Sequence, residues 1–238
     1  MVWWILATVS AFFVKGLCGF ANTLVFTSIL SFANENVNIS PVDLLLGYPS
    51  NLILTWKERK SIKWSVCLPL TALVIAGCIP GALFLKNADT GIVKIIFGIV
   101  IVLIGLEMLL REYRAKAAKQ SGIMLVVIGV LSGLLCGLYG IGALLGAYIS
   151  RVTDDNSAFK ANICFVFLAE NTFRVVLYAV WGILTFEVCK QAVLLLPLML
   201  LGLVLGILSG KFLNEKIVKK LVVILLIVSG VMLILNSL

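Results

Sequence analysis

The sequence predicts an all-α polytopic membrane protein built from two repeats of about four membrane segments each. Of its 238 residues, 62% are hydrophobic and only 13% are charged, whereas a soluble domain carries about 25% charged residues. The apolar residues fall into long blocks, several of them about as long as a membrane span. Short motifs of the first half also return in the second half, in the same order.

The apolar blocks follow one another with short polar or charged joints and leave no room for a soluble domain. Hydrocarbon offers no partners for free backbone N–H and C=O groups, so the blocks are expected to be helices. The blocks cover residues 2–32, 41–56, 64–85, 92–110, 122–150, 160–184, 191–213 and 217–236.

The beginning of the chain does not resemble a cleaved signal peptide. No basic residue precedes the first apolar block, and the block is too long for a signal core. Trp3 and Trp4 are expected to anchor this segment at the membrane interface. The six cysteines are scattered without a Cys-x-x-Cys pair, and the chain has no histidine. We therefore expect the cysteines to be small buried apolar side chains, and we expect no cofactor and no metal.

Motif pairs divide the chain into a first transmembrane repeat, residues 1–115, and a second, residues 116–238. Internal repeats of this kind are typical of secondary transporters. The matching segments are 16–20 with 137–141, 48–51 with 168–171, and 84–87 with 212–215.

The basic joints change place between the halves, which predicts repeats of opposite orientation. In the first half the joint at 57–63 is basic, and the corresponding joint of the second half, 185–190, is not. In the second half the stretch 211–220 is basic, and the corresponding joint of the first half, 86–91, is only weakly charged. Inversion needs an odd number of crossings per half. The first and fifth blocks, of about 30 residues each, allow this. As one helix, each block would be about 45 Å long, which exceeds the roughly 30 Å of hydrocarbon, so each block can instead form two shorter segments.

Both long blocks are therefore expected to be broken at a central glycine cluster, as hairpins or pairs of short helices. This places the N-terminus, the acidic joint with Glu35 and Asp43, and the C-terminus outside. The alternative is two strongly tilted helices in an ordinary eight-span topology.

The glycine clusters are the first candidate substrate site. A helix broken in the membrane exposes backbone amides and a positive helix end, which hold anions. The alternative is that these glycines only allow close helix packing. The candidates are Gly16, Gly19, Asn22 and Thr23 in the first break, and Gly137, Gly140 and Gly142 in the second.

Charged and amide side chains inside apolar blocks are the second set of candidates. Lys15 precedes the first break, where a charge costs about 3 kcal/mol of insertion free energy and attracts an anion; the alternative is that it extends to the interface. Glu170 and Arg174 lie four residues apart on one helix face, where they can pair. They are expected either to bind substrate or to form a purely structural ion pair. Asn51, Asn162 and Asn171 add hydrogen-bonding groups.

At these residues the chain resembles the sulfite exporter TauE/SafE family, whose repeats each open with Gly-x-x-Gly-[Ile/Phe]-Gly-Gly-Gly. Residues 137–144 read Gly-Leu-Tyr-Gly-Ile-Gly-Ala-Leu, and residues 16–23 read Gly-Leu-Cys-Gly-Phe-Ala-Asn-Thr and keep only the framework. The segments 41–60 and 158–162 are also similar to the family. The resemblance implies movement of sulfite or organosulfonates across a bacterial plasma (inner) membrane by a multi-pass protein. Asn22 and Thr23 replace bare backbone and favour a different anion.

The predicted function is therefore transport, in the direction of export, by alternating access around a mid-membrane anion site. Alternatives are a transporter or channel for another small anion, or a non-transporting membrane scaffold. An enzyme is not expected, because histidine, a paired acid motif and Gly-x-Ser-x-Gly are all missing. The expected partners are a small anionic solute and the lipid bilayer; a homo-oligomer stays open. No nucleic acid is expected, because the cations behind the net charge of +8 lie at block ends.

Overall fold

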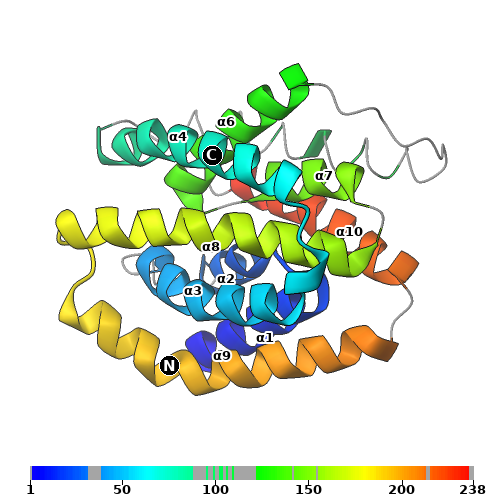
Figure 1. The fold of residues 1–238 in the computed structure, drawn as a ribbon. Coiled ribbons are helices and arrows are strands. Elements are labelled where there is room, and N and C mark those ends of the chain that lie inside the picture. Colours follow the sequence, from blue (N-terminus) through cyan, green and yellow to red (C-terminus); the bar gives the residue numbers. More distant parts are fainter. Residues whose placement is uncertain are drawn as a thin grey trace.

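The computed structural model describes residues 2–31, 39–87, 122–140, 142–153, 155–212 and 215–235, with six isolated positions between 95 and 109. Within these residues every regular element is a helix (Figure 1). Most of the fourth apolar block, Glu35 and part of the third motif pair lie outside the described residues. The helices are α1 Val2–Cys18, α2 Asn22–Ser31, α3 Ile39–Lys57, η1 Arg59–Ser61, α4 Trp64–Asn87, α6 Gly122–Tyr139, α7 Ala143–Val152, α8 Asn156–Val180, α9 Phe186–Phe212 and α10 Glu215–Leu235.

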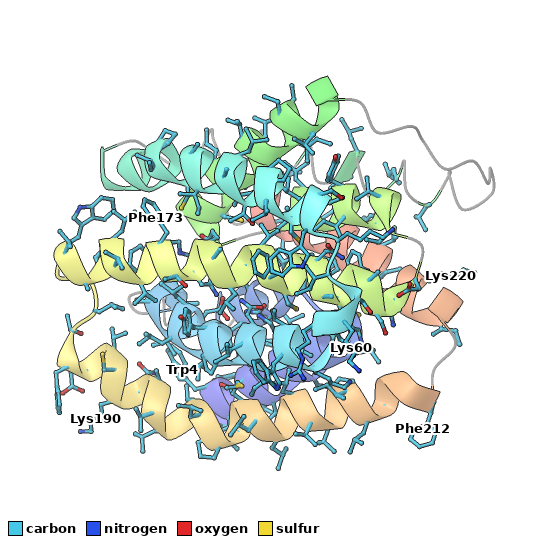
Figure 2. The ribbon with its side chains drawn as sticks, viewed as in Figure 1. Trp4, Lys60, Phe173, Lys190, Phe212 and Lys220 are labelled. Carbon is cyan, nitrogen blue, oxygen red and sulfur yellow. The ribbon has the colours of Figure 1, made fainter. Side chains whose placement is uncertain are left out.

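Three described helices are long and apolar enough to cross a membrane: Trp64–Gly81, Asn156–Val180 and Phe186–Gly210, with mean hydropathies of 1.7, 1.7 and 2.6. Their apolar side chains are not confined to the interior. Along α9, Val193, Leu201 and Leu208 are exposed, and Figure 2 shows side chains projecting outward from this helix along its length. An apolar outer surface of this kind is stable in lipid, so the structure agrees with a membrane protein.

The first and fifth blocks are each interrupted at their glycine cluster. The first becomes α1 and α2, and the fifth becomes α6 and α7. In each pair the two helices pack against each other, so the chain folds back at the break. Two strongly tilted continuous helices, the alternative for these blocks, do not form. The orientation of the two halves relative to the bilayer stays a prediction.

The long helices of the two predicted halves exchange partners. Helix α1 packs mainly against α9, and α6 packs mainly against α4, while α3 and α8 pack against each other at the centre (Figure 1). Helix α3 also contacts α9, as α8 contacts α4. The halves therefore share one interior instead of forming two separate cores.

Glycines set the close approach of the exchanged helices. At Gly16 an added Cβ would collide with the backbone of Leu203 in α9, and at Gly206 it would collide with the backbone of Phe13 in α1. In the other pair, Gly77 of α4 faces the backbone of α6 in the same way. Without side chains at these points the backbones come into contact, which maximises van der Waals packing between membrane helices.

Replacing Gly206 with alanine is expected to cost about 1–3 kcal/mol of stability, because the added methyl group forces α1 and α9 apart. Thermal unfolding followed by size-exclusion chromatography in detergent measures the loss. Gly122→Ala is the matched control, because a Cβ at Gly122 would meet nothing within 4 Å. Equal melting temperatures for the two variants would contradict a tight α1–α9 crossing.

Two expectations about individual side chains are resolved by the fold. Trp3 is exposed, but Trp4 is 6% exposed and stacks edge-on against Phe26 at 5.7 Å. The prediction of an interfacial anchor is therefore wrong for Trp4, whose ring is held inside by α2. Among the cysteines, Cys189 is exposed and the other five are buried, and all six are free.

Candidate functional site

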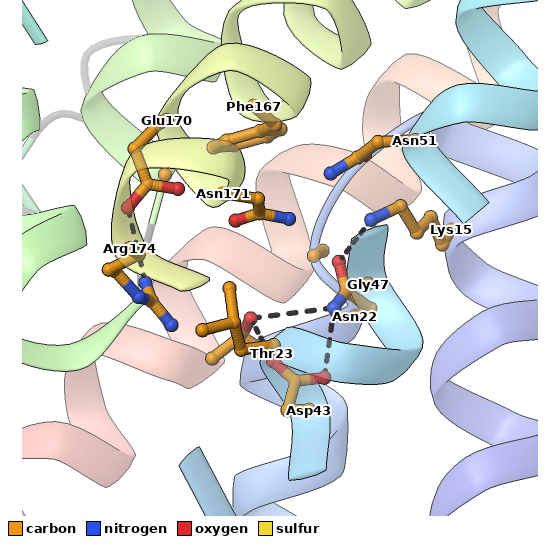
Figure 3. Close-up of a pocket in the computed structure, with 14 residues that line it drawn as sticks. Lys15, Asn22, Thr23, Asp43, Gly47, Asn51, Phe167, Glu170, Asn171 and Arg174 are labelled. Atoms are coloured by element: carbon orange, nitrogen blue, oxygen red, sulfur yellow. Dashed lines mark hydrogen bonds and ion pairs between the residues drawn. The ribbon is translucent and has the colours of Figure 1, made fainter. Parts of the chain in front are cut away.

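A polar cavity lies where the two helix breaks meet α3 and α8 (Figure 3). Its free volume is about 20 Å³, room for about one ordered water molecule, so the cavity in this structure is narrower than a typical small-molecule site. Its lining comes from both halves of the chain: Lys15, Ala21, Asn22, Thr23, Asp43, Leu44, Gly47, Asn51, Gly140, Gly142, Phe167, Glu170, Asn171 and Arg174.

Left-handed backbone at the two breaks ends one helix and starts the next. Gly19 and Gly140 have φ values of +89° and +69°, and Ala21 adopts φ +72° despite its Cβ. After the first break, the hydrogen bonding of α2 begins with the Val25 N–H, which donates to the carbonyl oxygen of Ala21 at 3.2 Å. The N–H groups ahead of such a bond have no partner within the helix, so the α2 and α7 ends offer donors beside the cavity.

Lys15 begins a chain of hydrogen bonds that runs along one wall (Figure 3). Its Nζ donates to Oδ1 of Asn22 at 3.0 Å, and Nδ2 of Asn22 donates to Oδ1 of Asp43 at 2.9 Å. The hydroxyl of Thr23 donates to Oδ2 of the same carboxylate at 2.5 Å. Lys15 is 1% exposed, so its ammonium group faces the cavity and does not extend to an interface.

Asp43 is the main correction to the sequence analysis, which placed it in an acidic joint outside. The residue lies in the first turns of α3, is 3% exposed and lines the cavity. The helix begins at Ile39, before the apolar block, and this carries the carboxylate inward to the start of α2. The prediction failed because an acid close to Pro41 in a polar stretch is typical of a loop.

On the opposite wall, Glu170 and Arg174 form a buried ion pair. Nη1 of Arg174 lies 3.3 Å from Oε1 of Glu170, and the side chains are 3% and 1% exposed. The same nitrogen donates to the carbonyl oxygen of Cys136 at 2.8 Å, near the end of α6. Nε of Arg174 is buried with no hydrogen-bond partner in the structure. The guanidinium is therefore neutralised and tied to the second break, while its Nε–H donor stays unpaired.

Asn51 and Asn171, at matching places in the two halves, bring amides to the centre. Asn51 is 1% exposed and its Oδ1 is buried without a partner. Asn171 lies against Gly47, where an added Cβ would be 3.5 Å from its Nδ2. An unpaired buried polar atom costs stability, so an unpaired amide aimed into a cavity is a place for a ligand to bind.

Two cations of α8 reach the two breaks. Nζ of Lys160 donates to the carbonyl oxygen of Gly16 at 3.2 Å, near the end of α1, as Arg174 does to Cys136 near the end of α6. Carbonyl groups at a helix C-terminus lack intrahelical partners and carry negative partial charge, so a cation stabilises them. Lys160 was not singled out by the sequence analysis, because nothing in its own segment shows that it contacts α1.

Removing Arg174 alone is expected to destabilise the protein more than removing the whole ion pair. Arg174→Met leaves the Glu170 carboxylate buried and unpaired, which costs about 3–5 kcal/mol. The double variant Glu170→Gln/Arg174→Met removes that charge and is expected to recover part of the loss. Thermal unfolding is measured for the wild type, both single variants and the double variant, and gives the coupling free energy between the two side chains. If the stability losses of the two single variants simply add up in the double variant, the ion pair is contradicted.

The structure brings most of the predicted site residues to the cavity, but four of them lie elsewhere. Gly16 packs against α9, Gly19 lies against Lys160, and Gly137 is buried within α6. Asn162 accepts hydrogen bonds from Lys63 N–H at 2.9 Å and from the Cys67 thiol at 3.0 Å, and so holds α8 against the beginning of α4. Residues that line the cavity but were not predicted are Ala21, Asp43, Leu44, Gly47 and Phe167.

The charges that line the cavity are balanced. Lys15 and Arg174 carry positive charge, and Asp43 and Glu170 carry negative charge. Within the described residues no group of three or more His, Cys, Asp or Glu side chains is placed to hold a metal ion. The arrangement thus offers helix N-termini, a lysine and unpaired amide and guanidinium atoms to a small polar solute.

Comparisons with known proteins bear on the chain as a whole. The family described as Sulfite exporter TauE/SafE matches residues 4–233, which is nearly the whole chain. No curated protein and no solved structure matches.

Proposed function

The chain belongs to the sulfite exporter TauE/SafE family, and from this we propose that it exports sulfite or a small organosulfonate. The family comprises membrane transporters of sulfur anions. The direction of movement, the individual substrate and a mechanism of alternating access in a bacterial plasma membrane belong to the proposal.

One observation supports the anion site above all others: two helix N-termini and the Lys15 ammonium converge on one buried cavity. Each offers positive charge or free N–H donors to the same small space. A sulfur oxyanion carries three oxygens around one centre, and each oxygen accepts hydrogen bonds. Donors placed on several sides therefore suit it better than they suit a flat or extended solute.

Alternating access is supported by the way the cavity is built. Its walls come from α1, α2 and α3 in the first half, and from the break between α6 and α7 and helix α8 in the second. A solute bound there touches both halves. Rocking one half against the other would open the site first to one side of the membrane and then to the other.

Transport assays in proteoliposomes test the proposal directly. Purified protein is reconstituted, vesicles are loaded with sulfite, methanesulfonate, sulfate or acetate, and efflux is compared with that from protein-free vesicles. Saturable efflux of sulfite or the sulfonate, competed by the other, is expected. If sulfate or acetate alone moves, the protein transports another class of anion; if no anion moves under any gradient, the proposal is wrong.

A further inference from the structure

We propose that Asp43 binds one proton when the cavity binds a singly charged anion, so that proton and anion cross the membrane together. The inference rests on the proposed function and adds its coupling ion and the residue that carries it. Export coupled in this way is driven by the solute's own outward concentration gradient, because the accompanying proton moves against the inward proton gradient of a bacterial plasma membrane. It starts from the buried carboxylate that the sequence analysis placed outside.

Asp43 occupies the hydrogen-bond donors that an anion at the first break needs. Its Oδ1 accepts from Asn22 at 2.9 Å, and its Oδ2 accepts from the Thr23 hydroxyl at 2.5 Å. Both donors belong to the first turn of α2 and line the cavity (Figure 3). The carboxylate therefore takes the place of a bound anion at this helix end.

Charge balance sets the requirement for a proton. In the empty cavity the two positive charges of Lys15 and Arg174 balance the two negative charges of Asp43 and Glu170. An anion that enters leaves one negative charge in excess, and an uncompensated charge in a buried site is costly. One proton on Asp43 restores neutrality.

Protonation also changes what Thr23 offers to the solute. When Oδ2 of Asp43 carries the proton, this O–H donates to the Thr23 oxygen, because a protonated carboxyl group is a donor. The hydroxyl hydrogen of Thr23 is then free to donate to an oxygen of the anion. The proton leaves Asp43 after the anion dissociates, and the original hydrogen bond forms again.

The surroundings single out Asp43 over Glu170. Glu170 is held in direct contact with Arg174 at 3.3 Å, whereas Lys15 reaches Asp43 only through Asn22. Facing Asp43 are Lys15 from α1, Asn22 and Thr23 from α2, and Glu170, Asn171 and Arg174 from α8. Helix α9, which also packs on α3, brings no charged side chain to the cavity among its described residues.

A proton fits this position better than sodium. Sodium would need several oxygen atoms with free lone pairs. Both carboxylate oxygens of Asp43 accept from side-chain donors, and Oδ1 of Asn22 accepts from Lys15. A proton needs only one carboxylate oxygen and adds no coordination shell.

The experiment compares wild type, Asp43→Asn and Glu187→Gln in proteoliposomes loaded with sulfite at an acidic pH, at which it is hydrogensulfite, a singly charged anion. The membrane potential and the pH gradient are set independently. Glu187 is an exposed acid at the start of α9 and provides the matched control. In wild type and control, a gradient of one pH unit is expected to support an accumulation ratio of about tenfold for a singly charged anion. Their flux is expected to be indifferent to the potential, because the coupled step moves no net charge.

Asp43→Asn keeps the side-chain volume but never gains or loses a proton. The variant is expected to exchange internal for external sulfite, which shows that it is folded. Its accumulation ratio under a pH gradient is expected to fall to near one, and its flux is expected to respond to the membrane potential. Accumulation in Asp43→Asn equal to wild type, or accumulation driven by sodium at constant pH, would overturn the inference and leave the proposed function standing. Absence of sulfite flux in wild type would instead contradict the proposed function.

Discussion

Replacing Lys15 with methionine is expected to lower anion flux at least about 100-fold, because the cavity loses a cation that is not already paired with a carboxylate. Removing the partner of a buried, hydrogen-bonded charge costs about 2–5 kcal/mol of binding free energy, and a 100-fold loss corresponds to about 2.8 kcal/mol. Methionine keeps most of the side-chain volume, so packing against Phe12, whose ring lies 5.9 Å from the ammonium, is largely retained. Initial rates of sulfite efflux from proteoliposomes measure the effect.

The matched control is Lys57→Met. Lys57 ends α3, is 41% exposed at its side chain and pairs with the adjacent Glu58 at 3.3 Å. Exposed pairs of this kind contribute about 0–1 kcal/mol, so the control is expected to transport like wild type. Lys15→Met with wild-type flux would show that the buried ammonium only stabilises the first break and that the anion binds elsewhere.

The second large effect is expected at Gly140, where Gly140→Ala should lower flux about 10–100-fold while the protein still folds. Two costs combine there. The backbone has φ +69°, which disfavours any side chain by about 1 kcal/mol. An added Cβ would also lie 3.0 Å from Nη1 of Arg174 and 3.1 Å from Nη2. The guanidinium must move away from the break and from the Cys136 carbonyl group.

Gly182→Ala separates these two costs. Gly182 follows α8 with φ +70°, and a Cβ there would meet nothing within 4 Å. It therefore reports backbone strain alone, without any contact to the cavity. A lower melting temperature in both variants, with loss of transport only in Gly140→Ala, is the expected result. Similar transport in both would mean that Arg174 has no part in moving the solute.

The local chemistry of the breaks could be predicted from the sequence, because it depends on neighbouring residues. Glycine clusters in blocks too long for one span located both interruptions, and charges inside apolar blocks identified Lys15, Glu170 and Arg174. These residues attract notice because a charge in hydrocarbon requires a partner. All three line the cavity.

The remaining features depend on contacts between distant segments. The position of Asp43 follows from how α3 meets the beginning of α2, and that of Lys160 from how α8 crosses α1. Gly19 and Gly140 hold the same place in the motif, yet one lies against Lys160 and the other lines the cavity. A glycine that permits close packing and a glycine that exposes backbone to a solute have the same local pattern, so only the tertiary structure distinguishes them.

The exchange of partners between α1 and α9, and between α4 and α6, has a consequence for synthesis. When the ribosome has produced only the first half, α1 and α4 are already in the bilayer while their main partners do not yet exist. The glycine faces of both helices must then be covered by lipid or by an insertase until the second half arrives.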